Sequence, residues 1–168
     1  REVVERLANR LPMPLRRDAL ATLSEVVLAL EKIARDHGPD AVGTIGETVI
    51  ENPSRNVIAG DLTFTAEFRS PSSATLDALD KGLQEAVTDI SKRRKVEIKL
   101  DRFWRKEPTV FDTRLVDAVQ HASDALGYAS RRIISGAGHD ACNLNAVMPA
   151  AMIFVPCKDG ISHNELED

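Results

Sequence analysis

The stretch NVIAGDLTFTAEFRS, residues 56–70, decides the fold class of this chain. Apolar and polar side chains alternate along it with a period of two. The apolar set is Leu62, Phe64, Ala66 and Phe68, and the polar set is Thr63, Thr65, Glu67 and Arg69. This alternation predicts a half-buried antiparallel strand over residues 56–69, with its polar face turned to solvent or to another chain.

The neighbouring patterns complete an α+β domain. Apolar residues at steps of three and four predict amphipathic helices at residues 14–37 and 73–94. Strands are predicted at 41–50 and 96–103, and a further strand is possible at 2–7. The order favours a ferredoxin-like two-layer sandwich, in which two helices cover one face of an antiparallel sheet.

The pattern changes near Glu107. A helix is predicted at residues 112–126, a short strand at 131–134, and a buried strand in the apolar run 150–155. We therefore predict two domains, 1–106 and 107–168, with the second a partial α/β segment. Roughly sixty residues are few for a self-sufficient domain.

Most of the residues that could take part in catalysis or metal binding lie near the end of the chain. A glycine-rich turn precedes His139 and Asp140, and a second loop carries His163. Asp140 has an alternative structural role, because it can cap the helix that starts after it. A lone histidine such as His163 is also more often structural or solvated than a ligand.

Composition excludes several classes of function. The 22 basic and 26 acidic residues give a formal net charge of −4, which does not favour a nucleic-acid partner. No apolar run is long enough to span a membrane, and no signal peptide is recognisable at Arg1. Cys142 and Cys157 are expected to be small buried fillers in a reducing, cytoplasmic setting.

The strings GAGHDA, MIFVP and DGISHNELE, in this order, resemble the end of the hydantoinase/carbamoylase branch of the dinuclear-metal aminoacylase and carboxypeptidase family. This branch includes N-carbamoyl-L-amino-acid hydrolases, allantoate amidohydrolases and β-ureidopropionases. The resemblance implies that His163 is a metal ligand, in a site that holds a pair of zinc, manganese, nickel or cobalt ions. It also implies that His139 and Asp140 lie beside the substrate.

The strings PMPLRRDAL and RNVIAGDLTFTAEFRSP resemble the lid, or dimerisation, domain inserted into the catalytic domain of that family. The resemblance implies a homodimer in which Asn56 and Arg69 reach into the active site of the partner subunit and bind a ureido or carbamoyl acid. It further implies that the N-terminal half of the catalytic domain, with the other metal ligands and the general base, is absent. Alone, the chain is then expected to be inactive and to bind metal weakly or not at all.

One position departs from the family. Aligned without a gap on Pro12 and Met13, Leu7 stands where the family has a histidine that polarises the scissile carbonyl. Leucine has no hydrogen-bond donor, and losing one such donor can cost about a hundredfold in rate. An alternative interpretation is therefore a non-catalytic dimerisation or ligand-binding α+β module. The choice among carbamoyl amino acids, allantoate and β-ureidopropionate is left open.

Overall fold

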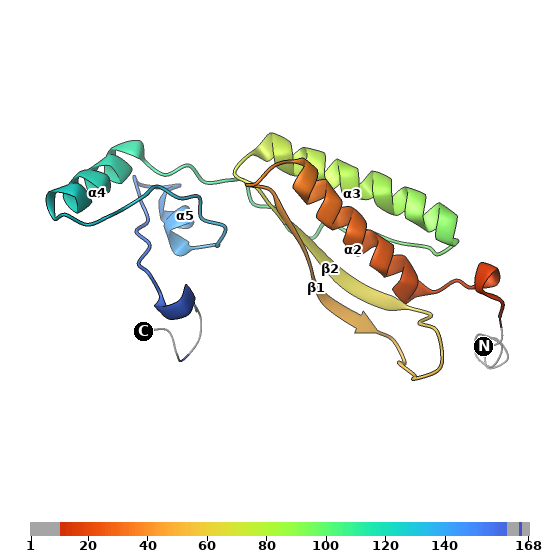
Figure 1. Cartoon of the computed structure of the whole chain (residues 1–168). Helices are drawn as coiled ribbons and strands as arrows, with labels where there is room; N and C mark the ends of the chain where they lie inside the picture. Colours follow the sequence, from red (N-terminus) through yellow and green to blue (C-terminus); the bar gives the residue numbers. More distant parts are fainter. Residues whose placement is uncertain (1–10, 161–164, 166–168) are drawn as a thin grey trace. The chain divides into compact units, whose positions relative to one another are not determined.

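The computed structural model describes residues 11–160 and residue 165. These form two compact units, Arg1–Pro108 and Thr109–Asp168, which we describe separately (Figure 1). The possible strand at residues 2–7, the departure at Leu7 and the metal ligand expected at His163 lie outside the described residues. Within the described part, no helix is long and apolar enough to cross a membrane.

Two long helices form one layer of the first unit, and each begins at a capping side chain. Helix α2 spans Ala19–Asp36, and Asp18 accepts hydrogen bonds from the backbone amides of Leu20 and Ala21. Helix α3 spans Ser73–Arg94, the range predicted from the sequence, and is capped by Ser72. The predicted start of the first helix at residue 14 was wrong, because Met13–Leu15 forms a separate 3-10 turn, η1, and the Asp18 cap sets the start.

The second layer is an antiparallel hairpin of β1, Val42–Ile50, and β2, Leu62–Arg69. Val42 pairs with Arg69 and Ile50 with Leu62, and the register shifts between Ile45 and Thr48. Thr65 supports this irregularity, since its Oγ1 accepts a hydrogen bond of 2.9 Å from the amide of Glu47. The α+β fold class predicted from the sequence is confirmed.

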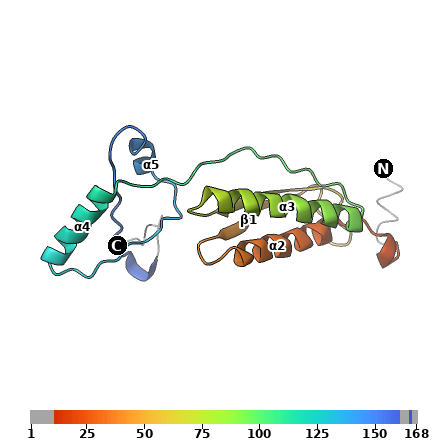
Figure 2. The same ribbon diagram turned by 90° about the horizontal axis from the view of Figure 1, so that it is seen from above.

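The core lies between the helices and the hairpin, with both helices on the same side of the sheet (Figures 1 and 2). Buried aliphatic residues of α2 and α3 form its centre: Leu23, Val26, Leu30, Leu83, Val87 and Ile90. The alternating apolar side chains of β2 pack against this cluster from below, as their spacing predicted. The hairpin thereby holds the loop of Asn56 at one end and Arg69 at the other.

The strand predicted at residues 96–103 was wrong. The described part of the sheet has two strands, and residues 96–103 run as extended chain outside it. Ile98 nevertheless packs against the core, as an inward-facing residue should. Extended chain forms a strand only where a partner strand supplies hydrogen bonds, and among the described residues none pairs with residues 96–103.

The second unit contains helix α4, Thr113–Ala125, and the short helix α5, Asp140–Leu144. Asp112 caps α4, and its own amide donates to the carbonyl of Ala150 at 3.1 Å. The strands predicted at 131–134 and 150–155 were wrong, because these residues have no regular secondary structure. Ile153 and Val155, predicted to be buried, are 70% and 74% exposed. Extended apolar chain forms a strand only when a partner strand supplies hydrogen bonds, and the described residues of this unit supply none.

Candidate functional site

Arg69 is the last residue of β2, where the strand turns toward α3. Its Nε donates a hydrogen bond to Oε1 of Glu67, and 53% of its side-chain surface is exposed. The hydrogen bond to Glu67 also raises the pKa of Arg69 above its usual range. A permanently charged and half-exposed guanidinium at a strand end is suited to pair with a carboxylate from outside the domain.

Asn56 lies in the loop that joins β1 to β2. Its Oδ1 accepts a hydrogen bond of 3.1 Å from Ser54 Oγ. The loop lines an open hollow together with the start of α2, and the residues around it are Arg16, Asp18, Leu20, Arg55, Asn56, Val57, Ile58 and Ala59. The asparagine is therefore placed at a polar surface hollow next to two arginines.

Asn56 and Arg69 do not converge within one chain. They lie at opposite ends of β2, and its eight residues extend over roughly 25 Å at about 3.3 Å per residue. Helix α2 runs over the same distance, with its first residues beside the Asn56 loop and its last residues before β1. A small ureido acid is much shorter than this separation. One copy of the chain thus presents two separate polar ends.

The neighbours of Asn56 were not recognised as part of a hollow from the sequence. In the structure, Arg16 Nε donates to the carbonyl of Leu11 at 3.1 Å, and Asp18 caps α2. The signal available for Asp18 was its residue type before an apolar helical pattern. Arg55 carried no signal except its adjacency to Asn56.

In the second unit, His139 and Asp140 stand together at the start of α5. His139 is the N-cap, and its Nδ1 accepts a hydrogen bond of 2.9 Å from the amide of Ala141. The alternative role suggested for Asp140 as the cap was therefore wrong by one residue. Asp140 is the exposed first residue of the helix. With Nδ1 accepting, the proton of a neutral His139 ring is on Nε2.

The loop that leads toward His163 contains two residues in left-handed conformations. Asp159 has a φ of 55° and Gly160 a φ of 70° within the 3-10 turn η2, Lys158–Gly160. The amide of Gly160 donates to the carbonyl of Cys157 at 3.1 Å and closes this turn. The expected ligand His163 follows three residues later, beyond the described residues.

The donor set for a metal pair is not found in the part of the chain that the structure describes. No group of three or more His, Cys, Asp or Glu side chains there could hold a metal ion. His139, Asp140 and the thiols of Cys142 and Cys157 do not form one. The described residues therefore do not fit a dinuclear metal centre on their own.

Comparison with known proteins identifies the class. The model of peptidase family M20/M25/M40 matches residues 18–168. The chain belongs to this family, which accounts for the α+β domain and for the histidine-containing strings that follow it.

Particular relatives carry more specific names. The chain is 36% identical over 157 residues to an N-carbamoyl-L-amino-acid amidohydrolase of Rhizobium meliloti, covering 94% of this chain and 38% of that protein. It is 30% identical to an allantoate amidohydrolase of Bacillus subtilis, covering 95% and 39%. Among solved structures, a hydantoinase/carbamoylase family amidase of Burkholderia multivorans matches with 45% identity and a TM-score of 0.91, covering 96% and 39%. The chain thus spans under two fifths of the length of each of these proteins.

Proposed function

We propose that this chain is part of an amidohydrolase that cleaves the C–N bond of N-carbamoyl-L-amino acids or related ureido acids, and that it is inactive by itself. The observation that carries the proposal is the match of 94–96% of the chain to proteins named for this chemistry, together with a charged Arg69 presented at a strand end. Allantoate and β-ureidopropionate are members of the same substrate class.

In this proposal the first unit is the lid, or dimerisation, domain of a homodimer. Arg69 binds the carboxylate of a substrate held in the partner subunit, since its planar fork pairs with both carboxylate oxygens. Asn56 supplies an amide donor or acceptor at the opposite end of the hairpin. Because the two ends lie roughly 25 Å apart, one subunit cannot place both residues on a single small substrate.

In the second unit, the proposed roles belong to residues near the end of the chain. His139 and Asp140 flank the substrate, and His163 supplies one ligand to a divalent metal pair in the intact enzyme. Zinc, manganese, nickel and cobalt all accept imidazole nitrogen. A bound metal pair would supply an activated water, and the chain's own residues would orient the substrate toward it.

The tautomer of His139 determines which ring nitrogen can donate a hydrogen bond to the substrate. Because Nδ1 is engaged by the Ala141 amide, only Nε2 can donate to a substrate oxygen. His139 would therefore act as a hydrogen-bond donor to the ureido group. A change of the cap would alter both the donor and the position of Asp140.

The proposal is tested by assaying the full-length natural protein, in the presence of added Zn²⁺, Mn²⁺, Ni²⁺ or Co²⁺ in turn, for release of amino acid from N-carbamoyl-L-amino acids. Allantoate and β-ureidopropionate are assayed in parallel, and N-acetyl-L-amino acids serve as the control for a general aminoacylase. We expect turnover of at least one ureido or carbamoyl acid and weaker turnover of the acetyl compounds. Turnover of acetyl compounds alone, or of none, would contradict the assignment.

A further inference from the structure

The backbone on both sides of Arg69 is held in place by hydrogen bonds. Before this residue β2 pairs with β1, and Arg69 itself lies opposite Val42 in the register. After it, the hydroxyl of Ser70 accepts a hydrogen bond of 3.2 Å from the amide of Ser72, whose side chain caps α3. Rotation of the long side chain is therefore the main freedom that remains at Arg69.

Glu67 restrains this rotation. Side chains two residues apart in a strand point to the same face. Glu67 and Arg69 share the exposed face of β2, opposite the side on which Ala66 and Phe68 pack against the core. Oε1 of Glu67 accepts the hydrogen bond from Arg69 Nε. A charge-assisted hydrogen bond of this kind is stronger than one between neutral groups, so it favours one orientation of the guanidinium.

The exposure of this pair limits its contribution to stability. About half of each side chain is exposed, 53% for Arg69 and 50% for Glu67. An ion pair in such a setting contributes little to folding, because water and salt screen it. The same contact still matters for binding, because a side chain that is already oriented loses less conformational entropy when a ligand arrives.

We propose that Glu67 is a positioning residue for Arg69, and that it directs the guanidinium edge formed by Nη1 and Nη2 toward the carboxylate of the substrate. An arginine can bind a carboxylate through Nε and one Nη atom, or through both Nη atoms. Glu67 accepts from Nε, so the inference assigns the second mode. It rests on the proposed function, in which Arg69 binds the carboxylate of a ureido or carbamoyl acid.

Steady-state kinetics of the full-length natural protein test the proposal, with the carbamoyl or ureido acid that the wild type turns over fastest as the probe. We expect Glu67→Ala to raise KM about two- to fivefold and to leave kcat unchanged, because the orientation of Arg69 affects substrate binding. Glu67→Gln keeps an acceptor oxygen and should raise KM less. The matched control is Glu47→Ala, which removes an exposed carboxylate from β1 and should leave KM unchanged.

Two further measurements separate positioning from a structural role. The Tm of Glu67→Ala should equal that of the wild type, since an exposed pair contributes little to stability. Adding Glu67→Ala to Arg69→Ala should not lower kcat/KM further, because Glu67 acts only through Arg69.

The outcomes distinguish this inference from the proposed function. If Arg69→Ala lowers kcat/KM but Glu67→Ala leaves KM unchanged, only the positioning role of Glu67 is overturned. A lower KM for Glu67→Ala would also overturn it, because Glu67 would then compete with the substrate for Arg69. Additive losses in the double variant would show that Glu67 acts independently of Arg69 and would overturn it as well. If Arg69→Ala leaves kcat/KM unchanged, the proposed role of Arg69 fails and this inference fails with it.

Discussion

Leu30 of α2 lies directly above Gly43 of β1, in the space that a larger residue would need. A Cβ atom at position 43 would lie 2.8 Å from Leu30 Cδ2 and 2.8 Å from Phe68 Cε1. Leu30 is 2% exposed and belongs to the core between α2 and the hairpin. The absence of a side chain at Gly43 thus allows the helix layer to approach the sheet.

This contact predicts that Gly43→Ala destabilises the first unit by about 1–3 kcal/mol, because the buried Leu30 and the partly buried Phe68 must move. Chemical denaturation followed by circular dichroism measures the change. Gly46→Ala on the same strand is the matched control, since its Cβ would meet only Thr65 Oγ1, at 3.1 Å. A loss for Gly43→Ala no larger than that for Gly46→Ala would contradict the close packing.

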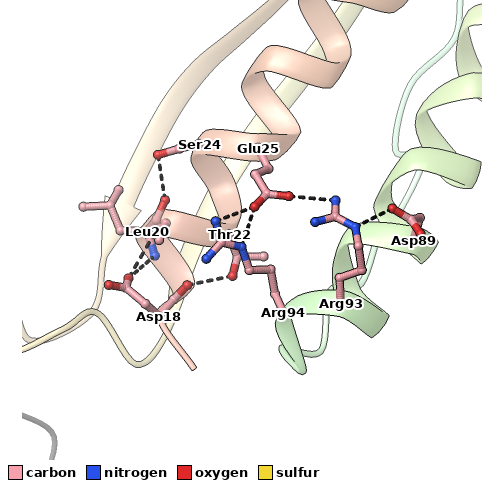
Figure 3. A network of polar contacts seen from close by, with 9 residues as sticks. Asp18, Leu20, Thr22, Ser24, Glu25, Asp89, Arg93 and Arg94 are labelled. Atoms are coloured by element: carbon pink, nitrogen blue, oxygen red, sulfur yellow. Dashed lines mark hydrogen bonds and ion pairs between the residues drawn. The ribbon is translucent and has the colours of Figure 1, made fainter. Parts of the chain in front are cut away.

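Glu25 links α2 to the end of α3, as Figure 3 shows. Arg93 Nη2 donates to Oε2 of Glu25 at 2.7 Å, and Arg94 Nε donates to Oε1 at 2.5 Å. The hydrogen bond from Arg93, followed by that from Arg94, lowers the pKa of Glu25 below 4.5. A carboxylate with a depressed folded-state pKa stabilises the protein above its unfolded pKa and loses that contribution as the pH falls through the folded value.

The resulting prediction is that Glu25→Gln reduces the free energy of unfolding at pH 7 and flattens its decline below about pH 4.5. Urea denaturation at several pH values measures both effects. Glu85→Gln serves as the control, because Glu85 forms only an exposed pair with Lys81 at 3.8 Å. If the free energy of unfolding varied with pH in the same way in wild type and Glu25→Gln, the ion pairs of Glu25 with Arg93 and Arg94 would make no contribution to stability.

The cap of α2 predicts a loss of about 1 kcal/mol for Asp18→Ala, because the amides of Leu20 and Ala21 lose their acceptor. Asp18→Asn should retain most of the stability, since its amide oxygen accepts the same bonds. Thermal unfolding of the three proteins measures the difference. Equal losses for the two variants would indicate that charge, rather than the capping geometry, carries the effect.

The hydrogen bond accepted by Thr65, at the register shift of the hairpin, leads to a further prediction about stability. Thr65→Val removes the acceptor for the amide of Glu47 while keeping the branched shape, and should cost about 1 kcal/mol. Thr65→Ser keeps the hydroxyl and should lose less. Hydrogen exchange at Glu47 reports the bond directly. Unchanged exchange at Glu47 in Thr65→Val would show that this amide has another acceptor.

The sequence predicted those elements whose stabilising partners are close in the chain or belong to the helix itself. Helix α3 was predicted residue for residue, because its apolar stripe and the Ser72 cap are local signals. Both strands of the hairpin were predicted from their residue patterns, but the predicted start of the second strand at residue 56 was wrong, because β2 begins at Leu62. The start of α2 was predicted too early, because the apolar pattern alone does not show that Asp18 caps the helix and sets its first residue at Ala19.

The predicted strands at 96–103, 131–134 and 150–155 failed for a common reason. Their composition favours an extended backbone, but a ladder depends on a second strand that composition does not locate. The candidate site was likewise predicted only in part. Sequence strings selected Arg69, Asn56, His139 and Asp140, whereas the separation of Asn56 from Arg69 and the cap formed by His139 emerge only from the three-dimensional arrangement.

The measurement that tests the central claim most directly is activity of mixed dimers of the full-length protein. Arg69→Ala and His163→Ala variants are each expected to be nearly inactive as homodimers. When they are co-expressed, a mixed dimer contains one site with an intact His163 and an Arg69 from the partner. Statistical assembly then predicts recovery of about one quarter of wild-type activity. Absence of any recovery, with mixed dimers verified by mass spectrometry, would contradict the claim that Arg69 serves the active site of the partner subunit.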